Sequence, residues 1–341
     1  MASSIGIGIV GSGFMGRTWT EVAAHHTPGA HLAGIGGGKR APGLAAEYGV
    51  PSYPVAELLQ RPDVGAVVLA TPPSSHVELA MACAAAGKHV LIEKPMATTV
   101  ADCDRIIEAA DRGGIKLAAV SQHRWRNSPR TAHDMVEAGR IGEVRMIRVI
   151  GPTAGWDAPE DAWKNEGAEQ TPFADWGAHA CDIARWFAGS PATLAFANSA
   201  SYSPDLPREQ STFAIYQFAN GVMADVWLTY EIPQPGLGSA LQFLVTGSEG
   251  MLDFDAYGTV RLGHGTTWET VYEQIPFDPL DPNSGPRLAA YALQLGDLLR
   301  AAREDGTPLV DGREGRSTAE MLEAADRSVR TGGAITLPLQ S

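Results

Sequence analysis

The sequence predicts an α/β fold in which a doubly wound parallel sheet is followed by a second domain of α+β type. Three observations lead to this prediction. Short apolar runs alternate with helix-like segments over the first 120 residues, a glycine-rich turn follows the first of these runs, and after about residue 140 the pattern changes to successive strands. Alternating strands and helices are typical of a parallel sheet with helices on its faces.

The first domain is expected to span residues 1–122. Ala-rich amphipathic segments, for example 77–86 and 100–112, separate its apolar runs and read as helices. The runs themselves are short and rich in Val, Ile and Leu, as expected for buried parallel strands. The strand candidates are 5–10, 31–35, 64–70, 89–92 and 116–120.

The second domain is expected to span residues 123–341, with its last helices as candidates to pack back on the first domain. Residues 213–218, the dipeptide Asn220-Gly221 and residues 222–230 predict a long hairpin, because Asn-Gly is a strong signal for a tight turn. Further strands are predicted at 240–246, 251–255, 259–262 and 268–275, and helices at about 286–304 and 314–330. This succession predicts a large, mainly antiparallel sheet.

Composition excludes several classes of partner. The formal net charge of −13 argues against nucleic acid and against anionic membrane, since both require a basic surface. The three cysteines, Cys83, Cys103 and Cys181, form no CxxC pair, which argues against a zinc or disulfide framework and fits a reducing compartment. We read no signal peptide and no apolar run of membrane-spanning length, so we expect a cytoplasmic protein.

The glycine-rich turn Gly11-Ser-Gly13-Phe14-Met15-Gly16 stands between a predicted strand and a predicted helix. This is the context in which GxGxxG binds a dinucleotide. The first glycine would form the tight turn, the second would let the backbone approach a pyrophosphate, and the third would let helix and strand pack closely. A glycine turn without a ligand is the alternative reading.

The residues after the second strand bear on the choice of cofactor. An acidic residue is usual about 20 positions after the loop, where it binds the adenosine ribose of NAD. This chain instead has three glycines followed by Lys39 and Arg40. Two cations suit a 2′-phosphate, which favours NADP over NAD. A solvated basic turn beside an NAD ribose is the alternative.

A third candidate site lies in the segment ADWGAHACDIARW at 174–186. Asp175 and His179 are four residues apart and share a helix face, with Asp182 one turn further on. They could serve as acid–base groups, as a solvated face, or as metal ligands together with Glu166 and Glu169. No recognised ligand spacing supports a metal, so none is predicted.

Motifs along nearly the whole chain resemble those of the glucose–fructose oxidoreductase/inositol dehydrogenase/MocA family of nicotinamide-dependent oxidoreductases. EKP together with the DxxxH block is specific, whereas either alone is not. The matching segments are GIVGSGFMG (8–16), EYGVP (47–51), ATPPSSH (70–76), EKP (93–95), QHRW (122–125), IGEV (141–144), the block with Asp175, His179 and Asp182, and 309–332.

The resemblance implies a Rossmann domain followed by an open sheet that packs against another subunit, giving a homodimer or homotetramer, with the active site between the domains. It implies that Lys94 contacts the reacting hydroxyl and that the bond before Pro95 is often cis. The implied cofactor-binding residues are Gly11, Gly13, Phe14, Met15, Gly16, Lys39, Arg40, Thr71, Pro72, His76, Glu93 and Lys94. The implied substrate-binding residues are Lys94, Arg124, Trp163, Asp175 and His179.

For the chemistry, an ammonium beside the carbinol oxygen stabilises alkoxide character, and a histidine can change charge near neutral pH. We therefore expect Lys94 to polarise the oxygen, His179 to act as general base in oxidation, and Asp175 to bind substrate or tune the pair. Lys94 taking the proton itself remains an alternative. Relatives often carry glycines before the aspartate, whereas this chain has residues 168–173, AEQTPF, preceded by Trp156, Trp163 and Lys164.

The predicted function is hydride transfer between a nicotinamide cofactor and a secondary hydroxyl or carbonyl of a sugar, cyclitol or similar cyclic polyol. NADP is favoured over NAD as the cofactor. One alternative is a glycoside-cleaving enzyme of the same family that oxidises, eliminates and reduces again. The other is a regulator that binds the cofactor without catalysis. The retention of Lys94, Asp175 and His179 together argues against the regulator, because a sensor needs no proton-transfer set.

Overall fold

The structure is a computed structural model that describes residues 4–152, 172–202, 210–233, 235–239, 241–278, 281 and 283–339. The chain divides into two compact units. The first comprises Met1–Trp125 and Phe277–Ala319, and the second comprises Arg126–Pro276 and Glu320–Ser341. The second unit thus begins at Arg126, while the segment from Phe277 to Ala319 belongs to the first unit.

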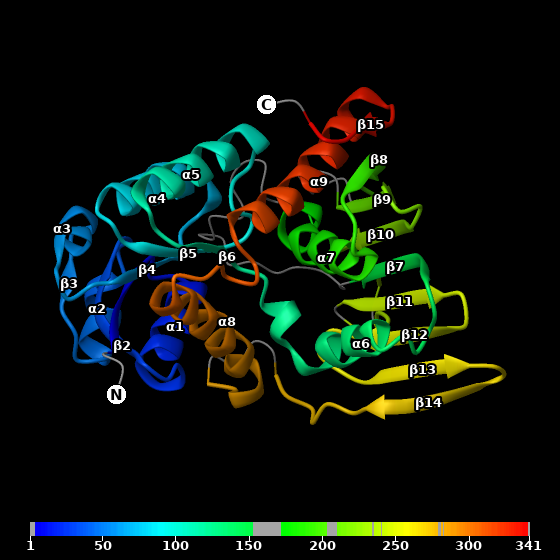
Figure 1. Cartoon of the computed structure of the whole chain (residues 1–341), viewed down its shortest axis with the longest axis horizontal. Helices are drawn as coiled ribbons and strands as arrows, with labels where there is room; N and C mark the ends of the chain where they lie inside the picture. Colours follow the sequence, from blue (N-terminus) through cyan, green and yellow to red (C-terminus); the bar gives the residue numbers. More distant parts are fainter. Residues whose placement is uncertain are drawn as a thin grey trace. The chain divides into compact units, whose positions relative to one another are not determined.

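The first unit contains a parallel sheet with the strand order β3-β2-β1-β4-β5-β6 (Figure 1). The chain adds β2 and β3 on one side of β1 and then β4, β5 and β6 on the other side, so the strand order reverses between β1 and β4. Doubly wound sheets bind nucleotides at this point. The strands are β1 (Ile5–Val10), β2 (Ala30–Gly36), β3 (Ser52–Tyr53), β4 (Ala66–Leu69), β5 (His89–Ile92) and β6 (Leu117–Ala119).

Helices cover both faces of this sheet. Neighbouring residues of a strand point to opposite faces, so they belong to different apolar clusters. Val67 and Val90 belong to one apolar cluster, and Val68 and Leu91 to the other. The first cluster includes α4 and α5, and the second includes α1 and α8. The helices are α1 (Phe14–Glu21), η1 (Val22–His26), α2 (Ala41–Glu47), α3 (Val55–Gln60), η2 (Pro73–Ser75), α4 (His76–Ala85), α5 (Val100–Gly113), η3 (Gln122–Trp125) and α8 (Gly285–Glu304).

The second unit is built on a sheet with the order β14-β13-β12-β11-β7-β10-β9-β8-β15. Neighbouring strands in this order pair in antiparallel fashion, except that β10 pairs with β7 in parallel. The strands are β7 (Val144–Pro152), β8 (Ala192–Ala200), β9 (Ser211–Phe218), β10 (Met223–Thr229), β11 (Gln242–Gly247), β12 (Gly250–Asp255), β13 (Val260–His264), β14 (Thr267–Tyr272) and β15 (Ile335–Thr336). The helices are α6 (Asn127–Glu137), α7 (Pro172–Ala188) and the later part of α9 (Gly312–Thr331).

The predicted hairpin at Asn220-Gly221 is confirmed. Strands β9 and β10 pair in antiparallel register, and Gly221 adopts a φ of 88°, which glycine reaches without a steric cost. The predicted fold class is confirmed as well, because a Rossmann-like parallel sheet is combined with a mainly antiparallel one. In the part of the chain that the structure describes, no helix is both long and apolar enough to cross a bilayer.

Candidate active site

The glycine-rich loop joins β1 to α1, and two of its glycines are required by packing. Gly11 has a φ of 117°, and a Cβ there would stand 2.3 Å from the carbonyl oxygen of Ala70. A Cβ at Gly16 would stand 2.2 Å from the carbonyl oxygen of Gly11. The loop therefore lies directly against the end of β4 and against its own helix, as the glycine pattern predicted.

Gly13 differs, because a Cβ at this position would meet no atom within 4 Å. Gly13 is the N-cap of α1 and carries no side chain to cap the helix, so N–H groups of the first turn remain available to an anion. Open space beside these N–H groups is what a pyrophosphate requires. The loop therefore fits a dinucleotide, with Phe14 and Met15 forming the start of the helix.

The turn after β2 lies beside this loop. The N–H of Gly11 donates to the carbonyl oxygen of Gly36 at 2.8 Å, and Gly37 and Gly38 follow with φ values of 76° and 80°. Lys39 and Arg40 come next, and both are exposed. Neither forms an ion pair with a described residue, so their charges are available to a ligand of the first unit.

Two further segments reach the same edge of the sheet, at the carboxyl ends of β4 and β5. Thr71 and Pro72 follow β4, and the Ser75 hydroxyl donates to Thr71 Oγ1 at 2.8 Å. Lys94 follows β5, is half-buried, and precedes Pro95 through a cis peptide bond, as the resemblance implied. The cofactor loop and Lys94 therefore lie at one edge, where open α/β sheets bind their ligands.

His76 is fully buried between these two segments. Its Nε2 lies 2.9 Å from the carbonyl oxygen of Thr71, and its Nδ1 lies 3.2 Å from those of Pro95 and Met96. Burial lowers the pKa of His76 below its usual range, although the three carbonyl oxygens act in the opposite direction. A neutral imidazole has one N–H to donate, so the ring bonds carbonyl oxygen on one side and packs against the other side, between the backbone segments that carry Thr71 and Lys94.

The Glu93 carboxylate is also buried, beside Lys94. One of its oxygens accepts the backbone N–H of Lys94 at 3.1 Å, and the other accepts the indole N–H of Trp19 at 2.8 Å. A carboxyl group whose two oxygens each accept an N–H has a fixed orientation, since both bonds would have to break for it to turn. Glu93 belongs to the EKP motif, whereas no motif in the sequence indicates Trp19 as its partner.

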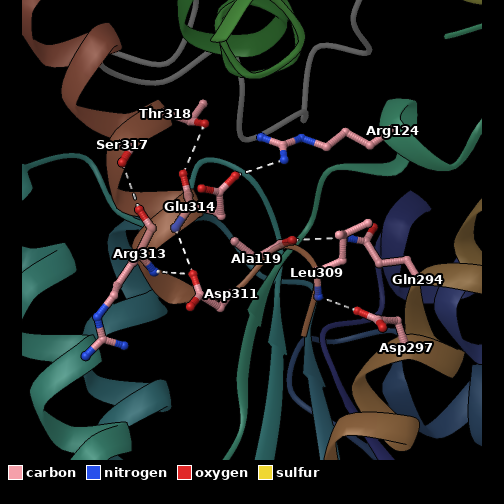
Figure 2. Close-up of polar contacts among 10 residues, drawn as sticks. All are labelled: Ala119, Arg124, Gln294, Asp297, Leu309, Asp311, Arg313, Glu314, Ser317 and Thr318. Atoms are coloured by element: carbon pink, nitrogen blue, oxygen red, sulfur yellow. Dashed lines mark hydrogen bonds and ion pairs between the residues drawn. The ribbon is translucent and has the colours of Figure 1, made fainter. Parts of the chain in front are cut away.

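Arg124 lies in η3 with its side chain only 4% exposed, and it is held by an ion pair. Its Nη1 is 2.8 Å from Glu314 Oε2 (Figure 2). Glu314 lies in the first turn of α9, where the Asp311 carboxylate accepts the backbone N–H groups of Arg313 and Glu314, both at 2.9 Å. The substrate role of Arg124 remains a prediction, and Glu314 fixes the guanidinium from 190 residues away.

The segment that carries Arg124 is braced a second time by α8. Gln294 donates to the carbonyl oxygen of Ala119 at 2.9 Å (Figure 2). Its side-chain oxygen accepts the N–H of Ser121 at 3.2 Å. Residue Val310 adds a backbone bond, accepting the N–H of Ala119 at 3.0 Å. The end of β6 and the start of η3 are therefore held in place by two segments from the C-terminal part of the chain.

In the second unit, α7 carries Asp175 and His179. Asp175 is half-buried, and the hydroxyl of Tyr230, at the end of β10, donates to its Oδ2 at 3.3 Å. Burial, and then the Asp175 charge, raise the pKa of Tyr230 far above its usual range, so Tyr230 stays a donor. His179 is 8% exposed and its ring meets that of Trp176 edge-on, with centroids 5.9 Å apart.

The remaining predicted residues divide into two groups. Asp182 is buried in α7, and Trp186, also in α7, stacks on His133 of α6 with ring centroids 3.8 Å apart. Trp163, and the neighbouring candidates at 156, 164, 166 and 169, lie outside the described residues. Among the described residues, no three His, Cys, Asp or Glu side chains are grouped to hold a metal ion.

Comparison with known proteins agrees with this geometry. Residues 5–120 match the model of an oxidoreductase family with an NAD-binding Rossmann fold, and residues 130–253 match the GFO/IDH/MocA C-terminal domain. The chain is 30% identical to inositol 2-dehydrogenase 2 of Saccharopolyspora erythraea, over 99% of this chain and 96% of that protein. It is 24% identical to the NAD(+) scyllo-inositol 2-dehydrogenase of Bacillus subtilis, over 100% and 98% of the two chains.

The same fold is seen in solved structures. An oxidoreductase from Agrobacterium radiobacter, crystallised with NAD+, L-tartaric acid and magnesium, superposes with a TM-score of 0.87 at 19% identity, over 98% of both chains. The first unit supplies the glycine loop and Lys94, the second supplies the sheet that follows the Rossmann fold in this family, and similarity extends along the whole chain. The chain therefore belongs to the GFO/IDH/MocA family of oxidoreductases, with an NAD-binding Rossmann fold.

Proposed function

We propose that this protein transfers hydride between a nicotinamide cofactor and a secondary hydroxyl or carbonyl of a sugar, cyclitol or similar cyclic polyol. The observation that carries the proposal is the shared edge of the first sheet, where the open loop at Gly13 and the Lys94 turn both project. The relatives named for inositol oxidation make the inositol stereoisomers the first substrates to test.

The bound nicotinamide supplies the hydride chemistry, and the protein positions the substrate and manages one proton. In this proposal the Lys94 ammonium lies against the substrate oxygen and stabilises its developing negative charge. His179 takes the hydroxyl proton during oxidation and returns it during reduction. Asp175, oriented by the Tyr230 hydroxyl, binds a neighbouring hydroxyl of the substrate.

NADP is the cofactor we favour. The support is the turn after β2, where two glycines replace the usual acidic side chain and Lys39 and Arg40 stand exposed. Arg40 is the N-cap of α2, so its backbone is fixed while its guanidinium remains available to a 2′-phosphate.

A parallel fluorescence titration of the purified protein with NADH and NADPH tests the cofactor assignment. We expect tighter binding of NADPH, and we expect Arg40→Ala to weaken NADPH about tenfold or more while leaving NADH nearly unchanged, because one charge-assisted bidentate contact is lost. Arg140→Ala, at an exposed arginine of the second unit, is the matched control. Equal losses for both cofactors would refute the 2′-phosphate site, and binding of neither would refute the oxidoreductase proposal.

We also propose that the subunits associate through the second sheet. Its solvent face carries large apolar side chains on four neighbouring strands, and we call this set the sheet patch. Its members are Met146 (50% exposed), Phe196 (40%), Phe213 (57%), Ile215 (50%) and Met223 (51%). Met146 pairs with Met223, and Phe196 with Ile215, so these side chains share one face. Exposed apolar groups concentrated in this way favour a protein interface.

A reducing compartment, the cytoplasm, is the location that suits the chain best. The support is the state of its cysteines, since all three are free and buried.

A further inference from the structure

A buried hydrogen bond connects the helix of the glycine loop to the turn that carries Lys94. Trp19 lies in the second turn of α1 and has no exposed surface. Its indole N–H donates to Glu93 across 74 residues of sequence, and the other oxygen of Glu93 accepts the Lys94 N–H. The carboxylate therefore bridges two elements that both face the proposed cofactor.

The indole is held in a single orientation by α8. The rings of Trp19 and Tyr291 meet edge-on, with centroids 5.1 Å apart and planes at 89°. One turn earlier on α8, Arg287 donates to the Thr18 hydroxyl at 2.8 Å and covers the Phe14 ring, with its guanidinium carbon 4.8 Å from the ring centroid. Helix α8 thus contacts the first residue and the second turn of α1 and restricts the orientation of the indole ring.

The consequence for Glu93 follows from its burial. A carboxyl group that is 5% exposed cannot replace a lost donor with bulk water, so removal of the indole N–H weakens the hold on its orientation and favours a different rotamer. Any such rotation also strains or breaks the second bond, the one to the Lys94 N–H. The Trp19 N–H is therefore connected to the Lys94 backbone through the Glu93 carboxyl group.

We propose that Trp19 is a positioning residue, which orients the Lys94 turn relative to the glycine loop through the Glu93 carboxylate. The catalytic part of this inference rests on the proposed role of Lys94. The positional part concerns only the bonds among Trp19, Glu93 and Lys94 and is independent of the reaction.

Trp19→Phe tests the proposal, since it keeps an aromatic ring and removes the N–H. The Lys94 amide should exchange with deuterium about tenfold faster or more, because its bond to Glu93 is weakened. We follow this amide in a peptide spanning residues 91–97 by mass spectrometry. The turnover number should fall about tenfold, since misplacing a reacting group by about 1 Å can cost up to ~100-fold, while the dissociation constant for NADPH should stay within about twofold.

Trp268→Phe is the matched control, because Trp268 is 46% exposed on β14 in the second unit. It should change neither amide exchange nor turnover. If Trp19→Phe leaves Lys94 exchange unchanged, or if turnover and NADPH affinity fall together, the positioning role is refuted.

Glu93→Asp provides a second test if Trp19→Phe does not fold, because a carboxylate shorter by one methylene cannot reach both donors. It should accelerate Lys94 exchange in the same way, and unchanged exchange would count against the proposal. A wild-type protein that binds NADPH but turns over no polyol would refute the proposed function alone. The exchange measurement would still decide the inference about Trp19.

Discussion

His76 shows what tertiary contacts add to a single residue. The resemblance placed it near the nicotinamide, whereas the structure gives its ring nitrogens three backbone carbonyl oxygens and no exposed surface. We therefore attribute to His76 the fixing of the turns after β4 and β5. A direct contact with the cofactor stays a prediction, because its ring already serves the backbone.

The lowered pKa of His76 predicts how stability depends on pH. Below the usual value of 6.5 the unfolded chain binds a proton that the folded chain refuses, so this contribution to stability is complete above pH 6.5 and is lost as the pH falls. Thermal denaturation between pH 8 and pH 5 should show a larger loss of melting temperature for the wild type than for His76→Gln. The exposed His264→Gln variant should follow the wild type, and parallel curves for all three would contradict the assignment.

His179 is the residue on which the proton-transfer proposal depends. His179→Ala should lower turnover on a good substrate by about 100-fold or more, the usual contribution of a general base. Its affinity for the cofactor should stay nearly constant. His133→Ala is the control and should retain turnover. His133 lies in α6 of the same unit, and its ring stacks on that of Trp186 in α7. Unchanged turnover in His179→Ala would leave Lys94 as the proton carrier.

At the scale of elements, the β1–α1 connection contains one glycine that packing requires and another that borders the space proposed for the cofactor. A methyl group at Gly16 collides with the backbone of Gly11, whereas a methyl group at Gly13 meets open space. The same kind of substitution should therefore act on different properties at the two positions, three residues apart.

Gly16→Ala should lower the free energy of unfolding by about 2 kcal/mol or more, because the contact with backbone cannot be relieved by a side-chain rotation. Gly13→Ala should change stability by less than about 1 kcal/mol, yet it should weaken NADPH binding about tenfold, because the methyl group occupies the space proposed for the pyrophosphate. Urea denaturation and fluorescence titration measure the two quantities. Loss of stability in Gly13→Ala with intact binding would reverse our assignment.

At the scale of the whole molecule, the sheet patch predicts the state of association. One charged residue in an apolar interface costs several kcal/mol unless it is paired, and in a symmetric dimer the substitution occurs twice. Ile215→Asp should therefore shift the protein to a smaller species in analytical ultracentrifugation at micromolar concentration. Ile275→Asp is the control, because Ile275 is 77% exposed and lies beyond the end of β14. A wild type that sediments as a monomer would refute the interface.

The sequence by itself determined the class of fold and the local parts of the site. Hydrophobic period and turn chemistry are local, so they located the strands around the glycine loop, the hairpin at Asn220-Gly221 and the two C-terminal helices. The glycine spacing indicated a candidate phosphate loop because each glycine answers a local steric demand. Lys94 and the pair Asp175 and His179 became candidates because short motifs carry them, and their roles stay predictions.

Only the tertiary structure decided the partners that hold these residues. Trp19 with Glu93, Arg124 with Glu314, and Asp175 with Tyr230 are 74, 190 and 55 residues apart. A single sequence shows no signal for such pairs, because Trp19, Glu314 and Tyr230 each read as an ordinary core or surface residue. Their contacts arise when the chain returns α8 and the start of α9 to the first unit and closes β10 beside α7. Orientation of a side chain depends on what surrounds it in space, and sequence spacing does not encode those surroundings.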